Sequence, residues 1–255
     1  MKHLKAICRG LLTAAFWVGV WWFAAWRMGK PLLFPTPPAV WKALIALVQT
    51  KAFYQSTAAS LWNVLAGILT AVCFAILLSV ITSRVSLIRQ AILPVMTVIK
   101  ATPVASFIIL AWIMMGAARV PGFITFLIVL PVVWTNLDVG FQKIDKQLTE
   151  ITTVYRFSPW KTARLLVLPS LKPYFVSAFR TSLGLAWKAG IAAEIITMPK
   201  NTVGAMIGEA KLYIMTAEMF AWTLVVILLS LLIEALFSAL LKRFAGYSAE
   251  REDVS

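Results

Sequence analysis

The stretch SLWNVLAGILTAVCFAILLSVI, Ser60–Ile81, contains no charged side chain. A helix needs about 20 mainly apolar residues to cross the hydrocarbon core of a bilayer, and this stretch has that length and composition. It therefore predicts a transmembrane helix.

Further apolar runs lie on both sides of this segment. They are Leu11–Trp26, Ile92–Met115, Gly122–Phe141, Tyr174–Thr197 and Met219–Leu241. Pro94 and Pro103 interrupt the run from Ile92, and a span tolerates proline where neighbouring helices or a water-filled path satisfy the freed backbone groups. We therefore predict an all-α, polytopic membrane helix bundle with about six transmembrane helices.

The composition supports a membrane protein and argues against other classes. Hydrophobic residues make up 61% of the chain and charged residues 13%, whereas soluble domains carry about 45–50% and about 25%. The net charge of +14 fits the positive-inside bias of membrane proteins, and no stacking platform or recognition helix indicates nucleic acid binding. With two cysteines and one histidine, the chain offers little for a disulfide framework or a metal site.

The lysines and arginines predict the orientation. Most of them fall at the N-terminus, in the connections after the second and fourth spans, and at the C-terminus. The richer side is expected to be cytoplasmic, so both termini should face the cytoplasm of a multi-pass cell-membrane protein. Residues 1–29 are predicted to be a retained transmembrane helix because no small-residue cleavage site follows the apolar run.

Two connections are too long to be simple turns. Residues 30–59, on the outer side, begin with a proline-rich entry and continue into Ala39–Val48, whose amphipathic spacing predicts a helix lying along the membrane surface. Residues 142–172, on the cytoplasmic side, carry six Lys or Arg. We expect two helical pieces there, Thr149–Phe157 with Thr149 as N-cap and Trp160–Leu168, separated by a break at Ser158-Pro159.

This helix–break–helix has two possible roles. A projecting pair of amphipathic helices offers a docking surface for another protein. The alternative is a hairpin packed against its own bundle, and in that case Trp160 would fill the core rather than an interface.

This loop contains a run of motifs in a fixed order: Glu150-Ile151-Thr152-Thr153, Arg156, Ser158, Trp160 and Val167-Leu168-Pro169. In these residues the chain resembles the "EAA" loop of ABC-importer permeases. Ile151 and Thr152 replace the two alanines of the family pattern, and Arg156 replaces its glycine. Because arginine adopts a positive φ poorly, we expect the helix break at Ser158-Pro159 instead.

Other stretches resemble the nitrate, sulfonate and taurine branch of these permeases, in order along residues 34–243. They are Phe34-Pro35-Thr36-Pro37, the start of the second span at Ser60, Pro94 with Lys100-Ala101-Thr102-Pro103, Asn136 with Gly140, Ala186-Trp187 through Glu194, and Gly204 with Gly208-Glu209-Ala210. The resemblance implies the fold of a type I importer permease, with its core over residues 60–243 and a cytoplasmic tail over residues 244–255.

The resemblance also implies partners. Such permeases form homodimers or heterodimers around a translocation path, receive a small solute from an external solute-binding protein, and couple to a separate ABC ATPase. The chain has no Gly-x-x-x-x-Gly-Lys-Ser/Thr phosphate loop, so it is not expected to bind ATP or any other cofactor, or to be an enzyme. The positions implied for the ATPase contact are Glu150, Thr153, Arg156, Phe157 and Trp160.

Four ionisable residues, Lys100, Asp138, Lys188 and Glu194, lie in or near apolar spans. Charges inside a membrane usually face a bundle interior, a partner or an aqueous path, so these four are candidates for the translocation path. A lysine at position 100 or 188 would suit an anionic solute such as a sulfonate, nitrate or taurine. Alternatively, Lys188 snorkels to the membrane surface, or it pairs with Asp138 or Glu194. Six residues correspond to about 600° of rotation, so Lys188 and Glu194 lie on different faces and are not expected to pair within one helix.

Three other classes compete with the importer permease. A self-contained secondary transporter or channel would carry its own coupling site, often within internal repeats, and no repeat relates the two halves. A membrane enzyme would need a catalytic constellation, which the few carboxylates and single histidine do not suggest. A scaffold protein would leave the ordered motifs unexplained.

Overall fold

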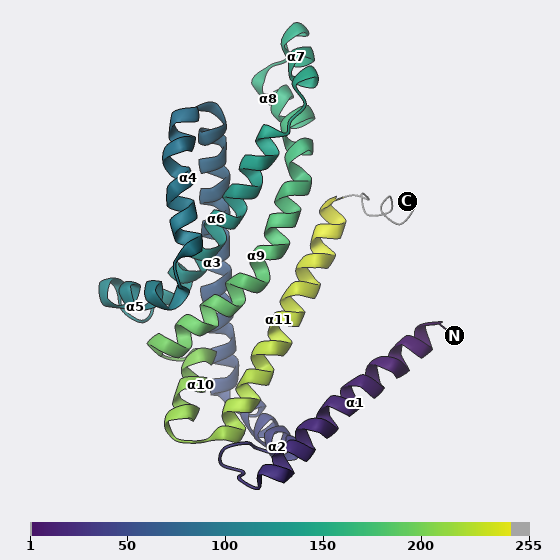
Figure 1. The fold of residues 1–255 in the computed structure, drawn as a ribbon, viewed down its shortest axis with the longest axis vertical. Coiled ribbons are helices and arrows are strands. Elements are labelled where there is room, and N and C mark those ends of the chain that lie inside the picture. Colours follow the sequence, from purple (N-terminus) through teal and green to yellow (C-terminus); the bar gives the residue numbers. More distant parts are fainter. Residues whose placement is uncertain (1, 246–255) are drawn as a thin grey trace.

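The computed structural model describes residues 2–245, with side chains described for residue 10 and residues 12–240. Every element in this part of the chain is helical. Its centre consists of α3 (Lys51–Arg84), α6 (Val120–Gln142) and α9 (Leu168–Thr197), and α6 packs along both of the others (Figure 1). The all-α prediction is confirmed.

Small residues let these three helices approach closely. A Cβ added at Gly67 of α3 would lie 2.5 Å from the carbonyl oxygen of Gly122 on α6. A Cβ added at Gly190 of α9 would lie 2.7 Å from the Val64 side chain. Close packing through small residues is the usual way for helices to associate within a bilayer, where apolar side chains gain little by leaving lipid.

The remaining helices flank this centre. α11 (Thr216–Ala245) runs beside α9, and at the end away from the 142–172 loop it meets α2 (Pro37–Val48) and α10 (Val203–Leu212). The indole N–H of Trp187 donates to the carbonyl oxygen of Val226 at 3.0 Å, which joins α9 to α11. α1 (Lys2–Met28) contacts the other helices at its C-terminal end, near α2, and its N-terminal end lies away from them (Figure 1).

The predicted third span is not one continuous helix. α4 (Ser86–Ala101) and α5 (Val104–Met115) meet at an angle of 102°. Pro94 stays within α4, whereas the chain turns at Thr102-Pro103. Pro103 lacks an N–H and disfavours a helical conformation at the residue before it, which explains why the helix ends there.

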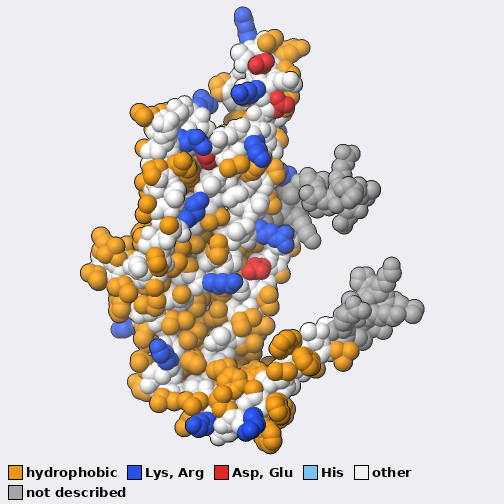
Figure 2. Space-filling view, viewed as in Figure 1, with side chains coloured by type: hydrophobic (Ala, Val, Ile, Leu, Met, Phe, Trp, Pro, Cys, Tyr) orange, Lys and Arg blue, Asp and Glu red, His pale blue; other side chains and the backbone are white. Residues whose placement is uncertain are grey.

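By length and composition, three helices in the described residues could cross a membrane: α3, α6 and α11. The bent pair α4–α5 would make a fourth. α9 has 30 residues but carries Lys172, Arg180, Lys188 and Glu194, so it is less apolar. Figure 2 shows that the surface is hydrophobic in the middle of the molecule, as expected of membrane-spanning helices. Charged side chains gather at the two ends, and a few lie amid the hydrophobic middle.

The remaining predicted helices are present with shifted bounds. α2 matches the helix predicted over Ala39–Val48, whose place at the membrane surface stays a prediction, and α3 starts at Lys51, before the predicted Ser60. In the 142–172 loop, α7 (Lys146–Val154) is the first piece. The second piece is not separate: α8 (Pro159–Thr162) leads through the π-helix η1 (Ala163–Val167) directly into α9.

Candidate functional site

The 142–172 loop projects beyond the ends of the other helices (Figure 1). The side chain of Asp145, and not Thr149, is the N-cap of α7, because it accepts a hydrogen bond from the N–H of Gln147 at 2.8 Å. None of the residues of α7 is buried. The alternative of a hairpin packed against its own bundle is therefore wrong for α7.

α7 ends in a tight turn at Arg156. This residue has a φ of 51°, and the N–H of the next residue, Phe157, donates to the carbonyl oxygen of Thr152 at 2.9 Å. A non-glycine residue in this left-handed conformation costs roughly 1–2 kcal/mol. The expectation that arginine would displace the break to Ser158-Pro159 is wrong, because the turn forms at Arg156 in spite of that cost.

The second helix starts immediately after this turn. The hydroxyl of Ser158 accepts a hydrogen bond from the N–H of Lys161 at 3.3 Å, and Pro159 takes the first helical position, where its missing N–H costs nothing. The π-helical segment that follows is a local widening of the kind often found at functional sites.

The predicted ATPase-contact residues lie together on this loop. Glu150, Thr153 and Arg156 are exposed, and Trp160 is 72% exposed. Phe157 is partly buried, with the Lys161 ammonium 4.0 Å from its ring centroid. Trp160 does not fill the core of its own bundle, so that alternative is wrong.

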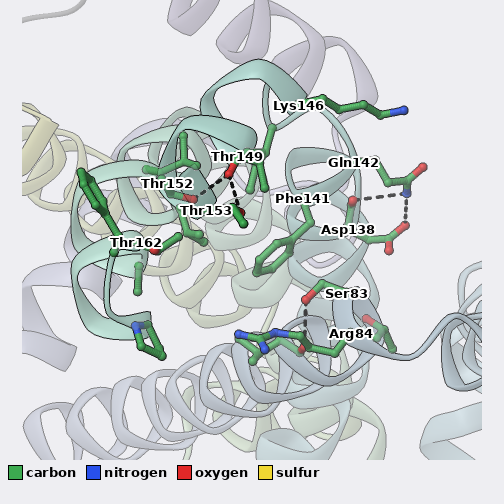
Figure 3. Close-up of a pocket in the computed structure, with 18 of the residues that line it drawn as sticks. Ser83, Arg84, Asp138, Phe141, Gln142, Lys146, Thr149, Thr152, Thr153 and Thr162 are labelled. Atoms are coloured by element: carbon green, nitrogen blue, oxygen red, sulfur yellow. Dashed lines mark hydrogen bonds between the residues drawn. The ribbon is translucent and has the colours of Figure 1, made fainter. Parts of the chain in front are cut away.

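A cavity of about 1040 Å³ lies beneath the loop, and we call it the loop-side cavity. It opens between the end of α3, the start of α4, the end of α6, and α7 with α8. In Figure 3, the threonines of α7 lie on one side of it and Ser83 with Arg84 on the other, while Lys146 points outward. Its charged lining residues are Arg84, Arg89, Asp138, Lys146 and Arg156.

Asp138 is held in this cavity by partners that the sequence did not reveal. Arg89 of α4 donates to its two carboxylate oxygens at 2.8 and 3.0 Å, and the amide of Gln142 donates at 2.8 Å. Asp138 is 5% exposed. It therefore ties α4 to α6, and the alternative of a pair with Lys188 is wrong.

Glu194 is fully buried and also acts within the fold. Its carboxylate accepts hydrogen bonds from the Ser60 hydroxyl at 2.6 Å, the Asn63 amide at 3.3 Å and the Gly204 N–H at 3.1 Å. These bonds join α3, α9 and the start of α10. Glu194 thus lies in the core of the chain and forms no pair with Lys188, and its place on the translocation path stays a prediction.

The two lysines predicted for the path are exposed. The ammonium of Lys100 donates to the Thr135 hydroxyl at 3.1 Å. Lys188 lines a second cavity of about 540 Å³ between α9 and α11, together with Arg180 and Glu234. Glu234 had been missed, although a carboxylate in an apolar span is itself a signal of a functional position.

No group of three or more His, Cys, Asp or Glu side chains is placed to hold a metal ion in the described part of the chain.

Comparison with known proteins identifies the family. Residues 63–246 match the family of binding-protein-dependent transport system inner membrane components. The chain is 23% identical over 246 residues to the taurine transport system permease protein TauC of Escherichia coli, covering 93% of this chain and 89% of that protein. It is 28% identical over 163 residues to the bicarbonate transport system permease protein CmpB of Synechocystis, covering 63% and 58%, and 30% identical over 147 residues to the nitrate import permease protein NrtB of Leptolyngbya laminosa, covering 55% and 50%. The chain therefore belongs to this family as the membrane permease subunit of a binding-protein-dependent ABC importer, and ATP hydrolysis is the task of a separate subunit.

Proposed function

We propose that this permease imports a small anionic solute along a path between two copies of the chain, and that α7 and α8 dock on the ATPase in the cytoplasm. A solute-binding protein delivers the solute from the opposite side, near α2 and α10. The observation that carries the docking role is the projecting loop with its unpartnered hydrophobic side chains.

Those side chains are too apolar for a surface that faces only water. Val154 is 77% exposed, Tyr155 72% and Trp160 72%. They stand on the part of the chain that projects beyond the membrane-spanning helices, so lipid does not explain them. Grouped exposed hydrophobic side chains mark protein interfaces, and tryptophan and tyrosine dominate binding energy at such sites. Glu150, Thr153, Arg156 and Phe157 would complete the contact.

The docking role is tested by co-purifying this chain with the ABC ATPase of its transport system. We expect Trp160→Ala to weaken the complex roughly 30-fold, since truncating an interface hot spot costs about 2 kcal/mol, and Glu150→Ala with Trp160→Ala to weaken it further. Trp41→Ala is the matched control, because Trp41 is 61% exposed on α2 at the other end of the molecule. Equal recovery of the ATPase with all variants would refute the contact, and no recovery with wild type would favour a self-contained transporter.

The anionic solute is supported by two observations. The relatives are named for taurine, bicarbonate and nitrate, and Lys100, Arg180 and Lys188 offer positive charge along α4 and α9. Uptake of taurine and nitrate by Lys188→Ala tests the role of that charge. We expect at least a tenfold loss of kcat/KM, in line with the roughly 1.5–3 kcal/mol of a hydrogen bond to a charged group. Unchanged uptake would remove Lys188 from the path.

A further inference from the structure

The loop-side cavity has an excess of positive charge. Of its four cationic lining residues, only Arg89 is neutralised, by the single carboxylate of the lining, Asp138. Arg84 and Arg156 form no ion pair within residues 12–240, where side chains are described. Lys146 adds charge at the rim. Several uncompensated cations around one cavity produce a positive potential, which attracts anions.

Arg156 supplies its guanidinium at a conformational cost. Three other non-glycine residues of the described chain, Met198, Asn201 and Ile214, also have a positive φ, but Arg156 is the charged one and it lines the cavity. Glycine would form the same turn without strain. Residues that keep a strained conformation are often functional. Because a glycine at this position would lack the arginine side chain, that side chain is the feature to which a function can be assigned.

The two unpaired guanidinium groups come from different parts of the chain. Arg84 ends the membrane-spanning helix α3, whereas Arg156 lies in the loop that contacts the ATPase. Guanidinium groups bind oxyanions through paired N–H donors. An oxyanion held by both would stabilise one position of the loop relative to the bundle.

We propose that the loop-side cavity binds an oxyanion of the phosphate or sulfate type through Arg84 and Arg156, and that this ligand regulates coupling. The regulatory role rests on the proposed docking of the loop, but the binding itself does not. The oxyanion has two possible sources, since the end of α3 lies where lipid headgroups are expected: the phosphate of an anionic lipid, or a soluble anion.

The test measures the thermal midpoint of the purified full chain without its ATPase, so that the nucleotide site of that subunit does not contribute. In one arm, sulfate replaces chloride at constant ionic strength in detergent. In the other, nanodiscs contain phosphatidylglycerol or only zwitterionic lipid. We expect the wild-type midpoint to rise by several degrees in at least one arm, and the responding arm identifies the source.

The variants locate the site. Arg156→Gly should lose the anion-dependent rise while keeping or raising the basal midpoint, because it relieves the strained turn; a merely structural arginine would not give this combination. Arg84→Gln should also lose the rise. Arg119→Gln, an exposed arginine outside the cavity, and Lys188→Ala, in the proposed path, should keep it. The proposal is overturned if no arm gives a rise, or if Arg156→Gly and Arg84→Gln retain it in full.

Discussion

At the scale of single residues, two buried carboxylates of this permease join its helices. Asp138 and Glu194 are both buried, and each accepts hydrogen bonds from at least one other helix. A buried carboxylate is tolerated only when it is hydrogen-bonded. Each one therefore joins separate helices. We expect its removal to lower the stability of the fold before it changes the selectivity for the solute.

Glu194→Ala should destabilise the permease by about 2–4 kcal/mol, because it leaves the Ser60 hydroxyl and the Gly204 N–H buried without an acceptor. Unfolding by SDS in mixed micelles measures the change. Glu209→Ala, an exposed carboxylate on the neighbouring helix α10, should change stability by less than about 0.5 kcal/mol. A Glu194→Ala variant as stable as wild type would contradict the structural role.

At the scale of helices, the contact between α3 and α6 depends on the absence of side-chain atoms. Gly67 faces the backbone of α6 so closely that a methyl group cannot be accommodated without moving the helices. Gly122, directly across the contact, has room, since an added Cβ would lie 3.4 Å from the Asn63 carbonyl oxygen. The two glycines thus form a matched pair on one interface.

Gly67→Ala should destabilise the permease by about 1–3 kcal/mol through overpacking. Gly122→Ala should be neutral or stabilising by up to about 1 kcal/mol, since alanine favours helices over glycine. The same SDS titration compares them. If both variants lost stability equally, the close approach of Gly67 to the backbone of α6 would be wrong.

At the scale of the whole molecule, the proposed topology places the 142–172 loop and the turn between α2 and α3 on opposite sides of the membrane. Lys143 and Gln49 are exposed positions in these two regions. They offer reporters for the orientation that the positive-inside rule predicts.

With Cys8 and Cys73 replaced by serine, Gln49→Cys should react with a membrane-impermeant maleimide in intact cells. Lys143→Cys should react only after lysis, when the permease is expressed without its ATPase. The extent of labelling on a gel gives the result. The reverse pattern would invert the topology and remove the cytoplasmic docking role.

Features that repeat along the chain could be predicted from the sequence. Features that depend on tertiary contacts could not. Apolar runs predicted α6 and α11 within a few residues, because the bilayer demands that composition. Nothing local connects Arg89 with Asp138, or Ser60 with Glu194, which lie 49 and 134 residues apart. The turn at Arg156 escaped prediction for a different reason, since the surrounding helices override its intrinsic preference.

The right-angled junction at Thr102-Pro103 makes α5 extend away from the line of α4. Its 12 residues correspond to a rod about 18 Å long, set across the direction of α4. A rotation of about 10° at the junction would swing the far end by roughly 3 Å, about the diameter of a water molecule. Arg89 anchors the opposite end of α4 to α6, and α5 itself packs on α6 and α9 through Ile108 and Ala111, so any change in the bend would require these contacts to shift together.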